Sequence, residues 1–202
     1  MEPFDINDPT QDPLAAKRDM DLTWGHAYAG HFDQTGRFEG ELSLRGETFP
    51  IDCVSTMDHS WGVRAERQTS RLCWLHAHFS SDFVVHGLFD FTTEGGPDAP
   101  SPLQLTHGYV LDHGKVYGLK AGGGTSWRAG LYAERIQLRV IDTADRTWEL
   151  EGGALTTFPW LAWPGTVGHN CLHRWTCNGQ TGYGEVMDFI GLGELGAVYN
   201  RR

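Results

Sequence analysis

The chain has 202 residues, of which 40% are hydrophobic, 21% charged and 12% aromatic, as is typical of one globular domain. Its 26 acidic residues outnumber its 16 lysines and arginines, so the net charge at pH 7 is −10. This charge argues against a surface that binds nucleic acid or anionic membranes, because phosphate groups need a basic footprint. No stretch approaches the roughly 18 apolar residues of a membrane-spanning helix.

The N-terminal residues and the cysteines predict a cytoplasmic protein. The opening sequence MEPFDINDPTQDP has neither a basic head nor an apolar middle, so it does not resemble a secretory signal. None of the four cysteines forms a C-x-x-C pair, and cytoplasmic thiols stay reduced. Cys53 and Cys73 lie in apolar, strand-like runs, and we expect them to be small buried side chains.

The chain divides into a lead-in and one domain. Residues 1–20 are rich in Asp and Pro and predict an extended, irregular segment with at most one helical turn. Residues 21–202 predict a single domain, because runs with period-two alternation recur and each closes on Gly, Asn, Asp or Pro. The expected strand pairs flank turns at Gly46-Glu47, Ser80–Asp82, Asp112–Gly114, Thr143–Arg146 and Asn178-Gly179.

About nine or ten short strands with almost no helical periodicity predict an all-β fold. Helices do not alternate with strands, so a parallel sheet is disfavoured and an antiparallel barrel or sandwich remains. Aromatic residues fall on both faces of several strands, which favours a lipocalin-like, calycin-type barrel with a ligand-sized interior. Residues 92–102 predict a long loop between strands of the same type.

The densest group of chemically active side chains begins at Asp58. His59 and Trp61 point to one face of an extended segment, and Asp58 points to the other. If His59 and Trp61 face the barrel interior, the imidazole supplies a titratable group and the indole stabilises positive charge. The alternative is structural: Arg64 pairs with Asp58 at the barrel end, and His59 donates a hydrogen bond to a carbonyl.

A second group comprises His76, His78 and His86. Trp74, His76 and His78 share one strand face, and a three-residue turn at 80–82 would place His86 opposite His76. A two-residue turn would move His86 away. Three imidazoles so arranged, with the Asp90 carboxylate on the His86 face, would bind zinc or iron, handle protons, or form a hydrogen-bonded structural patch.

Weaker signals complete the set of candidate residues. Glycine beside a histidine, as at His107-Gly108-Tyr109, allows a ligand or another backbone to approach closely. His173 and Trp175 are expected to share a strand face near the last hairpin. The sequence carries no G-x-S-x-G motif and no Cys–His arrangement that supports nucleophilic catalysis. We predict no cofactor and no resident metal.

The segment Asp58-His59-Ser60-Trp61-Gly62 resembles the D-H-x-W-G motif of the lipocalin-like carotenoid 1,2-hydratase/AttH superfamily, and the resemblance spans residues from about 20 to 190. The chain looks like a bacterial branch of this superfamily and resembles the second half of two-domain members. The resemblance implies a lipocalin-like barrel and acid–base chemistry on a C=C bond, with His59 and Trp61 as the principal pair. It allows a homodimer.

The superfamily's hydratases also use a carboxylic acid on a neighbouring strand, for which Asp90 and Asp58 are the candidates here. We also expect His86 to be a catalytic candidate, Arg64 to be structural, and residues along several strands to bind the substrate. These binding residues are Trp24, Trp74, His76, His78, His107, Tyr109 and Trp175.

Three functions follow as hypotheses. The first is a hydratase, isomerase or cyclase that acts on an isoprenoid, steroid or polyketide-like substrate held in the barrel. The second is a non-catalytic carrier of a lipid or isoprenoid. The third is a metal-dependent enzyme that uses His76, His78 and His86.

Overall fold

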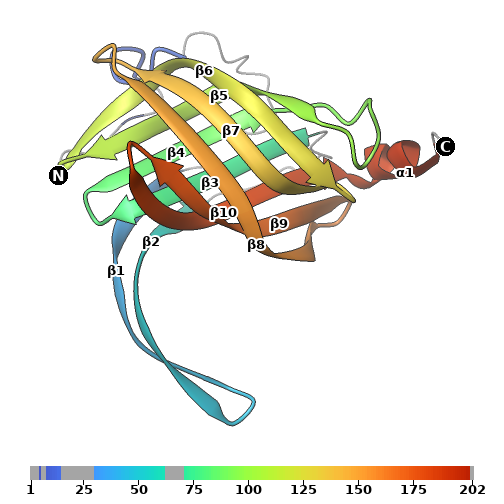
Figure 1. The fold of residues 1–202 in the computed structure, drawn as a ribbon, viewed down its shortest axis with the longest axis horizontal. Helices are drawn as coiled ribbons and strands as arrows, with labels where there is room; N and C mark the ends of the chain where they lie inside the picture. Colours follow the sequence, from blue (N-terminus) through green and yellow to red (C-terminus); the bar gives the residue numbers. More distant parts are fainter. Residues whose placement is uncertain (1–4, 6–7, 15–29, 62–70, 201–202) are drawn as a thin grey trace.

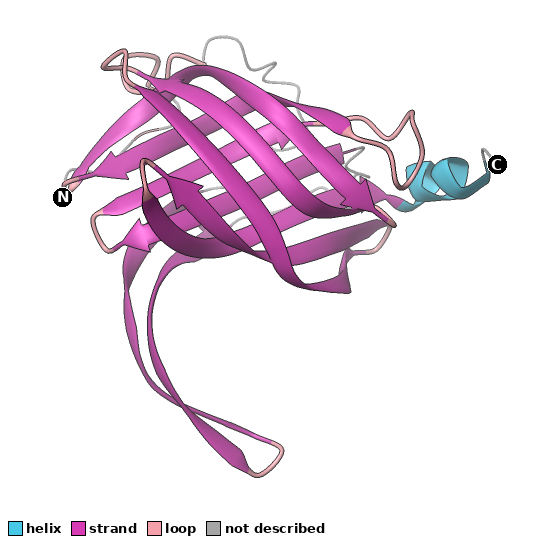
Figure 2. Cartoon of the chain, viewed as in Figure 1, coloured by secondary structure: helices cyan, strands magenta, loops and turns pink. Residues whose placement is uncertain are grey.

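The computed structural model describes residues 5, 8–14, 30–61 and 71–200, which are almost entirely β-structure (Figures 1 and 2). The elements are β1 (Gly30–Leu44), β2 (Glu47–Trp61), β3 (Arg71–Ser80), β4 (Phe83–Asp90), β5 (Ser101–Asp112), β6 (Lys115–Ala129), β7 (Tyr132–Asp142), β8 (Thr147–Trp163), β9 (Thr166–Cys177), β10 (Gln180–Gly191) and α1 (Leu192–Asn200).

Eight of the strands form a closed antiparallel barrel. Strands β3 to β10 pair with their neighbours in chain order, and β10 pairs back with β3 to close the sheet. Closure leaves no edge strand in the barrel, so each of its strands pairs with a neighbour on both sides. The prediction of an all-β, antiparallel, lipocalin-like barrel is confirmed.

Tight turns set the register of the hairpins. Arg45-Gly46, His113-Gly114 and Asn178-Gly179 all have positive φ at both residues, as in type I′ turns. Such turns match the right-handed twist of the flanking strands. The predicted turns at Asp112–Gly114 and Asn178-Gly179 are therefore confirmed, and the first turn is centred on Arg45-Gly46, one residue before the expected position.

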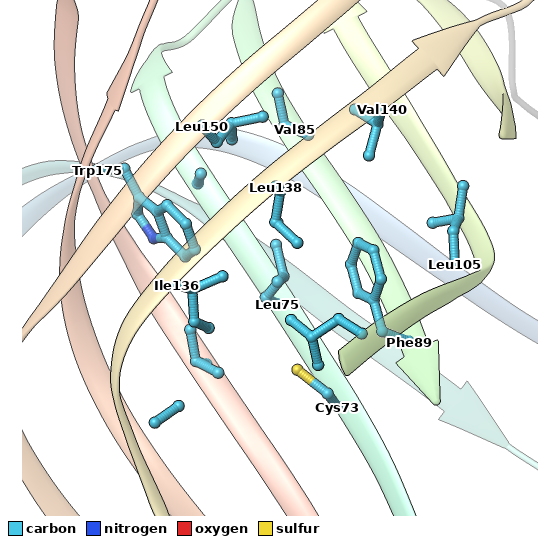
Figure 3. Close-up of a cluster of buried hydrophobic side chains, with 14 of the residues drawn as sticks. Cys73, Leu75, Val85, Phe89, Leu105, Ile136, Leu138, Val140, Leu150 and Trp175 are labelled. Carbon is cyan, nitrogen blue, oxygen red and sulfur yellow. The ribbon is translucent and has the colours of Figure 1, made fainter. Parts of the chain in front are cut away.

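The barrel interior is a packed apolar core (Figure 3). Alternate residues of all eight strands point inward, as the period of two requires. An eight-stranded barrel is just wide enough for side chains to fill. The inward side chains labelled in Figure 3 are Cys73, Leu75, Val85, Phe89, Leu105, Ile136, Leu138, Val140, Leu150 and Trp175.

Strands β1 and β2 lie outside the barrel. They pair only with each other, as a long curved hairpin that projects from the barrel wall (Figure 1). One face of the hairpin is apolar, with Leu42 opposite Phe49 and Phe38 opposite Cys53, and these side chains are exposed. The expectation that Cys53 is buried is therefore wrong, because its strand is not part of the barrel.

The C-terminal helix α1 was not predicted, since nine residues are too short to show helical periodicity. Val198 is buried, and Glu194 accepts hydrogen bonds from Arg71 and Thr93, which fix the helix beside the barrel end. Within the described ranges, no helix has the length and apolarity needed to cross a membrane.

Asp142 organises the turn between β7 and β8. Its fully buried carboxylate accepts hydrogen bonds from the backbone of Ala144 and Arg146, the Arg146 guanidinium and the Trp148 indole. Burial opposes ionisation, but these donors together lower the pKa of Asp142 below its ordinary value of 3.8. The folded state therefore stabilises the charged carboxylate.

We predict that Asp142→Asn lowers the free energy of unfolding by about 1.5–3 kcal/mol, the range for hydrogen bonds to a charged group. Because the folded pKa is depressed, this contribution is present at neutral pH and is lost as the pH falls below 3.8. Urea unfolding at pH 7 and pH 3 measures both effects. Asp145→Asn, at an exposed ion pair with Lys120, is the control and should change stability by less than about 1 kcal/mol.

Candidate functional site

His76 and His86 lie on the outer wall of the barrel and are nevertheless buried. Their chain neighbours Leu75, Ala77 and Val85 point into the core, so the two imidazoles point outward. Their exposed fractions are only 1% and 2%. The outer wall is therefore covered at this point.

The predicted pairing of His76 with His86 is confirmed, although the turn is not the expected one. Strands β3 and β4 are joined by a two-residue turn, and Ser80 pairs with Phe83. A bulge between His78 and Ser80 adds one residue to β3 and restores the register. The bulge thus keeps the two histidines together.

Aromatic rings surround the two imidazoles. The ring centroids of His76 and His86 are 4.1 Å apart and stacked. The Trp74 ring lies 4.2 Å from His76, and the Tyr109 ring lies 5.0 Å from His86. The Tyr109 hydroxyl is 3.5 Å from Nε2 of His76. These contacts confirm that the predicted faces of β3 and β4 converge, and they add Tyr109 from β5.

The base of the hairpin supplies a carboxylate that sequence reasoning missed. Asp33 on β1 places Oδ2 3.8 Å from Nε2 of His76. Next to it on β2, Thr56 Oγ1 lies 2.8 Å from Nε2 of His78. Asp33 pairs with Asp58 across the hairpin, so the two share a face. The sequence could have indicated that Asp33 lies beside the motif residue Asp58. Only the position of the hairpin in the structure shows that this face contacts β3.

The N-terminal lead-in adds a second carboxylate. Asp12 is fully buried, and its Oδ2 lies 2.8 Å from Nδ1 of His107 on β5. The His107 ring is in turn 5.9 Å from His86. The lead-in and the hairpin base therefore both contact the histidine-bearing wall, which accounts for part of its burial.

The environment favours the uncharged forms of His76 and Tyr109. Burial, reinforced by the nearby imidazoles of His86 and His78, lowers the pKa of His76 well below its usual range. Burial, then the charges of Asp33 and Asp58, raises the pKa of Tyr109. Nδ1 of His86 donates to the Leu75 carbonyl at 2.9 Å, so its lone pair is on Nε2.

The residues of the D-H-x-W-G motif lie on opposite faces of the hairpin. Asp58 is exposed on the face that carries Asp33, and its charge reaches Tyr109. His59 and Trp61 occupy the opposite face, where their rings cluster with Phe32 at 5.5–6.3 Å in solvent. They do not face the barrel interior, because the hairpin is not a barrel wall.

The remaining predicted residues lie apart from the cluster. Asp90 is exposed near the end of β4, and burial raises the pKa of its carboxyl. Trp175 points into the barrel core and stacks on His173 at 5.3 Å, so the predicted shared face is confirmed. Trp24 and Arg64 lie outside the described residues.

Three side chains lie close enough together to be candidate ligands of one metal ion. Asp33, His76 and His86 each offer one ligand atom, and these atoms lie within 4.8 Å of one another. His78 does not join them, since its two ring nitrogens lie 2.8 Å from Thr56 and 3.3 Å from the Tyr183 carbonyl. The arrangement is suited to proton transfer or to holding a cation.

The fold and this site define an eight-stranded antiparallel β-barrel protein with a buried histidine–carboxylate cluster on its outer wall. The chain belongs to the DUF7064 family, described as a domain of unknown function, whose model matches residues 5–188. No curated protein and no solved structure matched the chain.

Close backbone approach beside His86 depends on Gly108. A Cβ at Gly108 would lie 2.6 Å from the His86 carbonyl oxygen, which is too close for any other residue. We predict that Gly108→Ala costs about 1–3 kcal/mol of stability by forcing β5 away from β4. Gly153→Ala, where a Cβ meets nothing within 4 Å, is the matched control in thermal unfolding. Equal stability of both variants would contradict this packing.

Proposed function

We propose that this protein is an enzyme of the hydratase or isomerase type that acts by acid–base chemistry on a C=C bond of a hydrophobic substrate. The observation that carries the proposal is the contact of His76 Nε2 with the Tyr109 hydroxyl and the Asp33 carboxylate, 3.5 and 3.8 Å away. A buried base between an acid and a carboxylate is a common arrangement for proton transfer.

The roles follow from the protonation states. Neutral His76 accepts a proton at Nε2, and Asp33 stabilises the imidazolium that forms. Tyr109 keeps its proton and donates a hydrogen bond. The Trp74 ring packs against His76 in an edge-to-face arrangement, with the ring centroids 4.2 Å apart.

Two reactions share this machinery. In isomerisation, a base removes a proton from one carbon and the conjugate acid returns it to another, so the substrate mass is unchanged. In hydration, an acid protonates one alkene carbon and water adds to the other, and the proton released by water regenerates the acid. The substrate then gains one water.

The resemblance to the carotenoid 1,2-hydratase/AttH superfamily supports this reaction class. It assigns the central roles to His59 and Trp61, which with Phe32 form an exposed aromatic surface on the hairpin. We propose that this surface, on the hairpin face opposite Asp33, makes the first contact with the hydrophobic substrate, an isoprenoid, steroid or polyketide-like alkene, before its C=C bond reaches His76. Asp58, on the Asp33 face, is the candidate carboxylic acid.

A carrier of lipids or isoprenoids is the second candidate function. The exposed apolar face of the hairpin favours it, since such faces mark binding surfaces. A carrier would bind the same ligands without changing them, so product analysis separates the two functions.

The same hairpin face supports a homodimer. Phe38, Leu42, Leu44 and Phe49 each expose more than 40% of their surface. A second copy of the chain that covers this face would remove it from water.

A cytoplasmic location remains part of the proposal, and the four cysteines, all in described segments, are unbridged.

We expect the purified protein to convert at least one alkene from a panel of isoprenoids, steroids and flavonoids in heavy-oxygen water. His76→Asn should reduce turnover at least about 100-fold, the low end for loss of an acid–base group. His113→Asn, at an exposed histidine, is the control and should keep full turnover. Mass spectrometry distinguishes hydration, which adds labelled water, from isomerisation.

If His76→Asn turns over substrate at the wild-type rate, His76 is not the catalytic base. Substrate binding without any product would contradict the enzyme function and support the carrier function. His59→Ala should weaken substrate binding if the hairpin surface receives the substrate, and unchanged affinity would remove His59 from that role.

For the homodimer, light scattering after gel filtration should give twice the chain mass. Substituting Leu42→Ser and Leu44→Ser together should yield monomers, because the apolar face is lost. Glu41→Ser, on the polar face of the same strand, should leave the dimer intact. A wild-type monomer at micromolar concentration would contradict this proposal.

A further inference from the structure

We propose that Asp33, His76 and His86 bind one divalent transition-metal ion, such as zinc, between the barrel wall and the base of the hairpin. Their three ligand atoms lie within 4.8 Å of one another, and among the described residues no other such group of histidine, cysteine or carboxylate ligands was found. Two histidines from adjacent strands and one carboxylate from the hairpin make up the set.

The ligand types match this class of ion. Two imidazoles and one carboxylate bind Zn²⁺ or Fe²⁺ and leave coordination positions open for water or substrate. Ca²⁺ and Mg²⁺ prefer sites made of oxygen atoms alone, so they fit less well. The burial of both imidazoles excludes competing water from this side of the site.

His86 is already oriented as a ligand. Its Nδ1–H donates to the Leu75 carbonyl at 2.9 Å, which fixes the tautomer that carries the lone pair on Nε2. Metal-binding histidines commonly have such a second hydrogen bond, because it orients the ring and raises the basicity of the ligating nitrogen.

His76 lacks good hydrogen bonds without an ion. Its Nδ1 is buried with no hydrogen-bond partner among the residues that the structure describes, and Nε2 has only the long 3.5 Å contact with the Tyr109 hydroxyl. Buried polar groups are normally satisfied, and each exception requires an explanation. An ion at Nε2, shared with Asp33, would replace this long contact by a direct bond to the ring nitrogen.

The ligand atoms would have to move closer together to bind an ion. Ligand atoms at about 2.0–2.2 Å from a zinc ion in tetrahedral geometry are about 3.3–3.6 Å apart. His76 Nε2 and Asp33 Oδ2 are 3.8 Å apart, which side-chain rotations can close. His78 is held by Thr56 and the Tyr183 carbonyl instead, so Asp33 replaces it as the third ligand.

The ion site goes beyond the proposed reaction and does not depend on it. An ion at Nε2 would take the lone pair that otherwise accepts a proton there. Proton transfer would then pass to water on the ion and to the Tyr109 hydroxyl. Binding and turnover must therefore be measured separately.

The test is calorimetric titration of zinc chloride into the purified full chain after removal of metals with a chelator. We expect one ion per chain and a loss of at least about tenfold in affinity for His86→Ala, His76→Ala and Asp33→Asn. Asp33→Asn is the key variant, because the hairpin lies outside the barrel core and the barrel should stay folded. Thermal unfolding checks each variant.

Two control variants sharpen the result. His78→Ala and His113→Ala should bind zinc as the wild type does. Absence of zinc binding by the wild type, equal affinity in Asp33→Asn, or loss of binding in His113→Ala would overturn the site. Turnover of the chelator-treated protein is assayed separately, so failure of the ion site leaves the acid–base proposal to its own test.

Discussion

Two buried imidazoles on the outside of a closed barrel are the constraint on which the rest of the site depends. His76 and His86 are stacked at 4.1 Å on a surface that would otherwise face water. Stacking neutral rings in a covered site requires that other segments bring polar partners to them. The base of the hairpin supplies Asp33, and the lead-in supplies Asp12 to neighbouring His107.

The barrel and the hairpin have separate roles in this account. The inward side chains fill the barrel and stabilise it as a scaffold, whereas the outward faces of β3, β4 and β5 carry the chemical groups. Strands hold such groups more precisely than loops do. The hairpin completes the site from outside, so motion of the hairpin would change the site without disturbing the core.

Local sequence patterns predicted the barrel, its turns and the meeting of His76 with His86, because alternation and turn chemistry act over short distances. They did not predict which face points inward, since both faces of β3 and β4 are apolar enough to be buried. Asp33 and the free-standing hairpin also escaped prediction. Their positions depend on how β1 and β2 lie against β3, a contact between separate sheets that no spacing in the sequence encodes.

The outward orientation of the histidines is the central claim, and nuclear Overhauser contacts of the histidine rings test it most directly. The account predicts contacts from His76 to Trp74 and from His86 to Tyr109, with His86 in its Nδ1–H tautomer. Contacts from His76 to core residues such as Leu138 or Trp175 would place the imidazoles inside the barrel and contradict the account.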